Sequence, residues 1–146
     1  LWILVCLFDK ETNLKSAISA KSNGSLVISD RWPQREVVGT FDGARINVDS
    51  PKNRIVKYVK RREQKFLLLA SLIKPDLIIR LRVSPETSLI RKPNDLTLDQ
   101  AIRNSQLLND IEWGNTKLVD IDADQSIEEV NKTVRNKMWS QITDTF

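Results

Sequence analysis

The sequence predicts an α/β fold, in which a three-layer arrangement places helices on both faces of a parallel sheet. Short apolar runs of strand type alternate along the chain with longer segments whose apolar residues recur at helical spacing. Strands separated by helices favour parallel pairing, and mostly apolar strands indicate burial on both faces of the sheet. The length of 146 residues fits one domain, so we expect residues 1–146 to form a single domain.

The first half of the chain is predicted to hold two helices with a strand and a long loop between them. Asn23-Gly24 is a good stop signal after the first helical pattern. The loop carries glycine, proline, Asp and Asn without a clear period, and loops of this length are usually functional. In order, the predicted elements are a helix to about residue 22, a buried strand at Ser25–Ser29, a loop over residues 30–51, and a helix from Ile55 to Ile73 that ends before Pro75.

The second half shows clearer start signals. Ser84-Pro85 fits a helix N-cap followed by proline in the first turn, and Lys92-Pro93 closes that short helix. Thr97 and Ser126 each begin a capping box, with Gln100 and Glu129 three residues on. The predicted elements are a strand at Leu77–Val83, a helix from Ser84, a helix from Thr97, a strand at Lys117–Ile121 and a helix from Ser126.

Composition excludes several kinds of chemistry. There is one cysteine, Cys6, and no histidine, so an internal disulfide, a Cys/His zinc site and His-dependent triads are all excluded. Carboxylates, Arg, Lys and an oxygen-bound metal remain, and phosphoryl transfer needs little else. No run of about 18 apolar residues occurs, so we expect no membrane partner. With a single cysteine, a reducing cytoplasm is the simplest location to expect.

Basic residues are concentrated in residues 52–65, where seven cations stand against a single acid, Glu63. Three interpretations stay open: a solvated helix face, a surface that faces phosphates, or a nucleic-acid surface. No zinc finger or aromatic stacking motif accompanies the charge, so we expect no nucleic-acid partner. If this segment did bind nucleic acid, oligonucleotide affinity would fall steeply with salt.

The residues that follow the predicted strands are the first candidates for a site, because ligands of open α/β sheets bind beyond the carboxyl ends of the strands. Asp30 and Arg31 follow Ser25–Ser29 at once. An Asp there can hold Mg²⁺ or orient an acceptor hydroxyl, and an Arg can bind phosphate with its planar fork. An ordinary ion pair at the strand end is the alternative.

Three motifs in order resemble the thymidylate kinases and their P-loop relatives. Val27 to Pro33 is similar to the Asp-Arg-aromatic motif of that family, and Lys74 to Pro93 resembles its next strand, helix start and arginine-bearing lid. Val119 to Ala123 resembles its last strand and adenine-side loop. Asp42 to Ile46, Asp-Gly-Ala-Arg-Ile, is similar to a segment of the thymidylate-kinase-like members. The likeness covers nearly the whole chain and implies ATP and Mg²⁺ as cofactors and a nucleotide or nucleoside as substrate.

The resemblance also implies roles for individual residues. Catalytic roles go to Asp30, Arg31 and Arg91, and Asp30 is the implied metal ligand. The implied substrate-binding residues are Arg31, Trp32, Gly43 and Arg45, and the implied cofactor-binding residues are Arg91, Lys92 and Asp122, with Asp122 to Gln125 beside the adenine. The resemblance further predicts that Asp30, Arg31 and Arg91 face one cleft, and it allows a homodimer.

The sequence departs from this family at its defining element. None of the four glycines stands in the pattern Gly-x-x-x-x-Gly-Lys-Ser/Thr, whose backbone amides cradle phosphates. We therefore expect the first strand and the P-loop to be missing, either because the chain is a fragment or because the loop has been lost. A phosphotransferase is the first hypothesis, and a non-catalytic nucleotide-binding or regulatory module on the same fold is the second.

Overall fold

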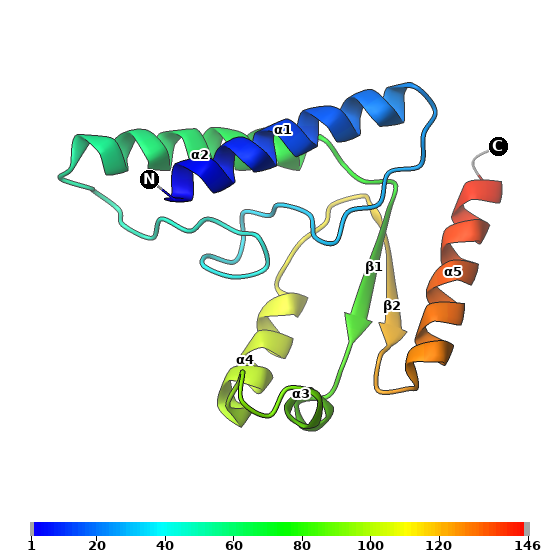
Figure 1. The fold of residues 1–146 in the computed structure, drawn as a ribbon. Helices are drawn as coiled ribbons and strands as arrows, with labels where there is room; N and C mark the ends of the chain where they lie inside the picture. Colours follow the sequence, from blue (N-terminus) through cyan, green and yellow to red (C-terminus); the bar gives the residue numbers. More distant parts are fainter. Residues whose placement is uncertain (1, 145–146) are drawn as a thin grey trace. The chain divides into compact units, whose positions relative to one another are not determined.

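The computed structural model describes residues 2–144, which form two compact units, divided between residues 74 and 75. The first unit contains two helices joined by a long loop, and the second contains the sheet with three helices (Figure 1). The single domain over residues 1–146 stays a prediction.

The helices and strands follow the predicted order closely. Their bounds are α1 Trp2–Ser22 and α2 Arg54–Leu72 in the first unit, then β1 Leu77–Arg82, α3 Pro85–Arg91, α4 Leu98–Asn109, β2 Lys117–Asp122 and α5 Ile127–Thr143 in the second. Within residues 2–144, no helix is both long and apolar enough to cross a membrane.

Helix α1 ends in a Schellman motif, as its Asn-Gly stop signal predicts. Gly24 has a φ of 76°, in the left-handed region that glycine adopts without steric cost. The amide of Ser25 donates to the carbonyl of Ala20, and the amide of Gly24 donates to that of Lys21. These two bonds satisfy carbonyls that the last turn of the helix leaves free.

The core of the first unit lies between α1 and α2, which run side by side in the same direction (Figure 1). Its buried members are Leu7, Leu14, Phe66, Leu67 and Ala70. At the edge of this core, the guanidinium of Arg62 donates twice to the carboxylate of Glu11, over 3.0 and 2.6 Å. These hydrogen bonds lower the pKa of Glu11.

The predicted strand at Ser25–Ser29 is wrong. The segment carries no strand in the structure, and Leu26 and Ile28 are 63% and 71% exposed. A strand needs a neighbour for its backbone hydrogen bonds, and within residues 2–144 the sheet consists of β1 and β2 alone. The β-branched composition favoured a strand, but among the described residues no partner strand pairs with the segment.

The second unit is built on the parallel pairing of β1 with β2, in which Leu77 lies opposite Lys117 and Arg82 opposite Asp122. This pairing confirms an α/β fold with parallel strands. Helix α5 packs on one face of the pair, where Ile121, Ala123 and Val130 form a buried cluster. The three-layer sheet stays a prediction.

The opposite face of the strand pair carries charge, because side chains alternate along a strand. Arg80 donates to both carboxylate oxygens of Asp120, its partner in the register, over 2.5 and 2.9 Å. Arg82 adds a 3.1 Å ion pair to Asp120 and donates to the side chain of Asn109 at the end of α4. Arg80 also donates to the carbonyl of Leu108, so the two arginines join α4 to the sheet.

Both capping boxes form as predicted, and each fixes a helix start. Thr97 and Gln100 bond reciprocally at α4, and Ser126 and Glu129 do so at α5. Ser84 caps α3 by accepting from the amide of Thr87. Replacing a capping residue by Ala costs about 1 kcal/mol, so these side chains define helix starts strongly.

The Arg80–Asp120 pair predicts a pH dependence of stability. Hydrogen bonds from Arg80, then from Arg82, lower the pKa of Asp120 from 3.8 to about 2. A lowered pKa means that the contribution is fully present above pH 4 and is lost as the pH falls towards 2. We expect Asp120→Asn to lower the free energy of unfolding by about 1 kcal/mol at pH 6, since solvent weakens half-exposed pairs.

Urea unfolding of the two proteins at several pH values measures this difference, which should shrink to nearly nothing by pH 2. For Arg80→Ala the difference should shrink over the same pH range but not vanish, because this change also removes the hydrogen bond to the carbonyl of Leu108. A gap for Asp120→Asn that stays constant from pH 6 to pH 2 would contradict the assignment.

Candidate nucleotide-binding loops

Two loops hold most of the residues predicted for the site, one in each unit. We call residues 30–51, between α1 and α2, the acceptor loop, and Asp122–Gln125, between β2 and α5, the β2–α5 loop.

The acceptor loop is folded around the side chain of Gln34, which is only 3% exposed. Its amide nitrogen donates to the carbonyls of Val37 and Thr40, and its amide oxygen accepts from the amide of Val37. One side chain thus satisfies three backbone groups that lie outside any helix or strand. Such groups must be paired when they are buried, so Gln34 decides the course of the loop.

A tight turn follows, from Thr40 to Gly43, with the amide of Gly43 donating to the carbonyl of Thr40. Its two central residues, Phe41 and Asp42, have φ values of 48° and 59°, which is rare for residues other than glycine. Gly43 itself is needed because of close packing: a Cβ there would lie 1.8 Å from the carbonyl oxygen of Val37. Packing against the backbone of Val37 therefore explains why glycine stands in the Asp-Gly-x-Arg-Ile segment.

Helix α2 holds the next residues of the loop through Glu63. The carboxylate of Glu63 accepts from the backbone amides of Arg45 and Ile46, over 3.0 and 3.2 Å. Glu63 itself is buried, with 6% of its surface exposed, and the two hydrogen bonds are partly buried. The interaction fixes the backbone at Arg45, one of the predicted substrate-binding residues.

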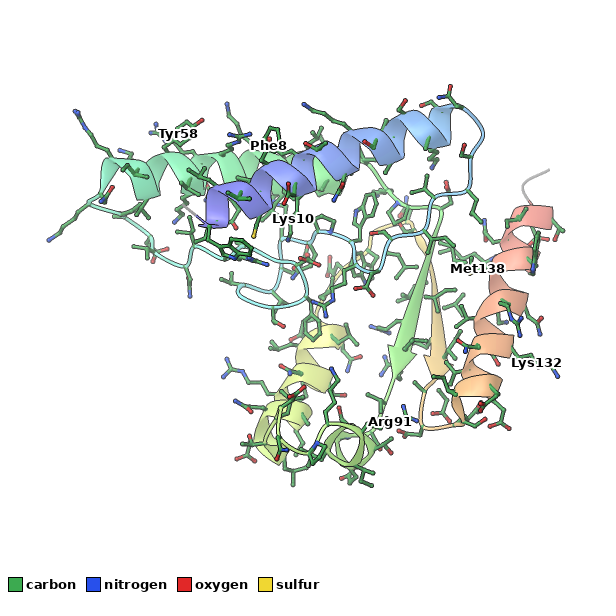
Figure 2. The ribbon with its side chains drawn as sticks, viewed as in Figure 1. Phe8, Lys10, Tyr58, Arg91, Lys132 and Met138 are labelled. Carbon is green, nitrogen blue, oxygen red and sulfur yellow. The ribbon has the colours of Figure 1, made fainter. Side chains whose placement is uncertain are left out.

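A shallow hollow lies between α1, α2 and the acceptor loop. Lys10, Asp42, Arg45 and Glu63 bring charge to its lining, and apolar side chains such as Phe66 complete it. Lys10 lies on the side of α1 that faces the loop (Figure 2) and pairs with Asp42 at 2.5 Å. The guanidinium of Arg45, by contrast, has no hydrogen-bond or ion-pair partner among residues 2–144.

Asp30 and Arg31 lie exposed at the start of the acceptor loop. Trp32, the next residue, is anchored: its indole NH donates to the carbonyl of Ala70, and its ring packs on the α1–α2 core. The indole therefore serves the structure of the loop, and its predicted contact with substrate stays a prediction. That Asp30 and Arg31 share a cleft with Arg91 also stays a prediction, because Arg91 belongs to the second unit.

In the second unit, Arg91 and the β2–α5 loop lie together. The guanidinium of Arg91 donates to the carbonyls of Ala123 and Gln125, over 2.7 and 3.1 Å. Figure 2 shows Arg91 at the end of α3, beside the turn that follows β2. Its planar fork spans both carbonyls, which a lysine ammonium cannot do with the same geometry.

Asp124 makes a second connection between the ends of the two strands. Its carboxylate accepts from the amide and the hydroxyl of Ser84, which follows β1, over 2.9 and 3.1 Å. The hydrogen bond from the Ser84 amide is the main cause of the lowered pKa of Asp124. The loop is also fixed from within, because the amide of Asp124 donates to the carboxylate of Asp122.

The other predicted positions are less constrained. Lys92 is exposed and makes only a 3.8 Å ion pair with Asp95. No group of three or more potential metal-ligating side chains occurs in the part of the chain that the structure describes. Asp30 therefore offers a single carboxylate, which fits Mg²⁺ only where substrate phosphates and waters supply the other ligands.

The residues that shape both loops include three that sequence reasoning missed as site residues: Gln34, Glu63 and Ser84. Glu63 left one signal, because it is the single acid in a strongly basic segment. Gln34 could not have been identified from the sequence, because nothing distinguishes one Gln from the other polar residues of a long loop.

Comparisons with known proteins give distant relatives. The chain is 31% identical over 137 residues to YghR of Escherichia coli K12, called an uncharacterized ATP-binding protein, and the match covers 89% of this chain and 53% of YghR. It is 27% identical over 117 residues to YghS of the same strain, also called an uncharacterized ATP-binding protein, covering 80% of this chain and 49% of YghS. The chain spans about half the length of these curated relatives. No family model matches the chain, and no solved structure matches it.

The packing at Gly43 predicts a large effect of one methyl group. We expect Gly43→Ala to destabilise the first unit by about 2 kcal/mol or more, since overpacking a filled site costs about 1–3 kcal/mol. Gly39→Ala is the matched control in the same loop: its Cβ would meet nothing within 4 Å, but its φ of 82° is left-handed. Gly39→Ala should lower the free energy of unfolding by about 1 kcal/mol, because alanine is strained at a left-handed φ. Urea unfolding measures both, and equal losses would contradict the packing argument.

Proposed function

We propose that this chain carries the base-binding and acceptor-binding parts of an ATP-dependent phosphotransferase of the thymidylate-kinase-like type, acting on a nucleotide or nucleoside. The observation that carries the proposal is the braced β2–α5 loop at the carboxyl end of a parallel strand, where α/β proteins bind nucleotides. The similarity of most of the chain to proteins named for ATP binding supports it.

On the donor side, the β2–α5 loop is the proposed neighbour of the adenine. Arg91 and Asp122 bond its backbone and Asp124 ties it to Ser84, so the loop has one shape before a ligand arrives. A preformed loop binds more tightly because no ordering entropy is lost on binding. The Arg91 guanidinium already donates hydrogen bonds to two carbonyls of this loop. Its main role in this proposal is therefore to fix the conformation of the loop that binds the base. Contact with the transferring phosphate, which the resemblance implies, would require those bonds to exchange.

On the acceptor side, the proposal uses Arg31 and Arg45. Both residues are exposed, and no residue in the described part of the chain occupies either guanidinium. Arginine is well suited to phosphate because its fork donates two parallel hydrogen bonds. Asp30 is placed to orient an acceptor hydroxyl or a water on Mg²⁺. When bound, Mg²⁺ would neutralise charge on the donor phosphates.

One observation favours a second candidate, a nucleotide-binding module without catalysis. The printed sequence contains no Gly-x-x-x-x-Gly-Lys-Ser/Thr pattern. Both candidates share the base site and differ in whether a phosphate-binding loop is supplied from elsewhere in the polypeptide.

The base site predicts that Arg91 affects ATP affinity through the loop. We expect Arg91→Ala to weaken ATP binding about tenfold, the effect of about 1.4 kcal/mol. We also expect faster hydrogen exchange at the amides of Ala123 and Asp124, which are hydrogen-bonded in the intact loop. Titration calorimetry measures the change in ATP affinity, and mass spectrometry measures the change in amide hydrogen exchange.

Lys92→Ala is the matched control, because it removes a neighbouring cation that does not touch the loop. It should leave the exchange unchanged. ATP affinity unaffected by Arg91→Ala, together with faster loop exchange, would show that this loop does not contact the base.

The missing glycine-rich pattern predicts that the 146-residue chain has no phosphotransferase activity by itself. Losing one preorganised donor typically costs a rate factor of about 10²–10³, so the 146-residue chain alone should transfer no phosphate from ATP to thymidylate or thymidine. A longer chain with an in-frame P-loop before residue 1 should do so with Mg²⁺, and Arg31→Ala should abolish the transfer. A radiolabelled phosphate assay measures this. A folded but inactive longer chain would favour the binding module, and turnover by the 146-residue chain would contradict the expected need for the loop.

A further inference from the structure

Glu63 is an acidic residue buried in a strongly basic helix, which is an unusual position for a carboxylate. Helix α2 carries six Lys and Arg residues and one acid, and that acid is buried beside Phe66 and Leu67. The nearest cation along the helix, Arg62, pairs with Glu11 instead. The charge of Glu63 is met by the two amides of Arg45 and Ile46.

Burying a carboxylate is expensive unless hydrogen bonds compensate it. An apolar side chain at position 63 would extend the α1–α2 core at lower cost, so packing of the helices does not explain the acid. What the carboxylate adds is a fixed position for two consecutive amides of the acceptor loop. Hydrogen bonds to a charged acceptor are about twice as strong as neutral ones, which suits this use.

The backbone that Glu63 holds is that of Arg45, which lines the same hollow and whose guanidinium has no partner among residues 2–144. The other lysine or arginine side chain of that lining, Lys10, is neutralised by Asp42. Arg45 is therefore the cation of the hollow that is available to an incoming anion. Its reach depends on where its backbone is held.

We propose that Glu63 is a positioning residue, which sets the backbone of the acceptor loop so that Arg45 receives the phosphate of a nucleoside monophosphate. This inference rests on the proposed function and adds to it a preference for a phosphorylated acceptor over the nucleoside. Glu63 itself does not touch the ligand in this scheme; it acts through Arg45.

The test compares the affinities of the 146-residue chain for thymidine 5′-monophosphate and thymidine by titration calorimetry. The wild type should bind the monophosphate at least about tenfold more tightly, a difference of about 1.4 kcal/mol. Arg45→Ala and Glu63→Ala should each reduce this ratio to nearly one. The double variant should lose no more than either single variant, because both changes remove the same interaction.

Hydrogen exchange gives a readout that does not need a ligand. Glu63→Ala should speed exchange at the amides of Arg45 and Ile46 at least about tenfold, the effect of losing about 1.4 kcal/mol of protection. Glu63→Gln should rescue part of it, since its amide oxygen still accepts. Glu11→Gln is the matched control, because it removes a carboxylate that bonds α2 but not the loop. It should leave these two amides unchanged.

The outcomes separate the inference from the proposed function. Unchanged exchange at both amides in Glu63→Ala, with the fold intact by circular dichroism, would overturn the positioning role. Additive losses in the double variant would also overturn it. Faster exchange in a chain that binds neither thymidine compound would support the positioning of the loop and overturn the proposed acceptor. Tight binding of both compounds with no preference would overturn the phosphate-binding role of Arg45.

Discussion

Irregular backbone that packs against a helix or a strand must find hydrogen-bond partners outside regular secondary structure, and both loops of this protein depend on that constraint. In the acceptor loop the partners are the side chains of Gln34 and Glu63. In the β2–α5 loop they are Arg91 and Asp122. Four side chains thus replace the ladder that a sheet would have supplied. Each loop consequently has a defined shape at the place where the proposed ligands bind.

The same constraint distributes the charges of the molecule. Lys10, Arg62 and Arg80 are each paired with a carboxylate, and Arg91 is bonded to two carbonyls. Arg31 and Arg45 have guanidinium groups without a partner in the described structure. The cations that hold the structure together are therefore not the ones that remain available to bind a ligand. The proposed phosphate contacts follow from this division rather than from the number of basic residues, six of which lie along α2.

Local patterns in the sequence predicted most of the elements correctly. The capping boxes at Thr97 and Ser126 form as expected, and the Asn23-Gly24 stop ends α1 with a Schellman motif. These signals depend on residues within one turn of one another, so they can be recognised without a fold. Ser25–Ser29 failed for the opposite reason: its β-branched residues favour a strand, but a strand exists only when another segment pairs with it.

The sequence by itself determined the helices, the two strands that pair, and the identity of the candidate motifs, because propensity, capping and periodicity are local properties of the chain. Only the tertiary structure decided which side chains hold the loops and which cations remain available. Glu63 lies 18 positions from Arg45, and Arg91 lies 32 positions from Ala123. Contacts over such separations are set by the packing of α1 on α2 and by the parallel register of β1 with β2, neither of which is written in any short stretch of sequence.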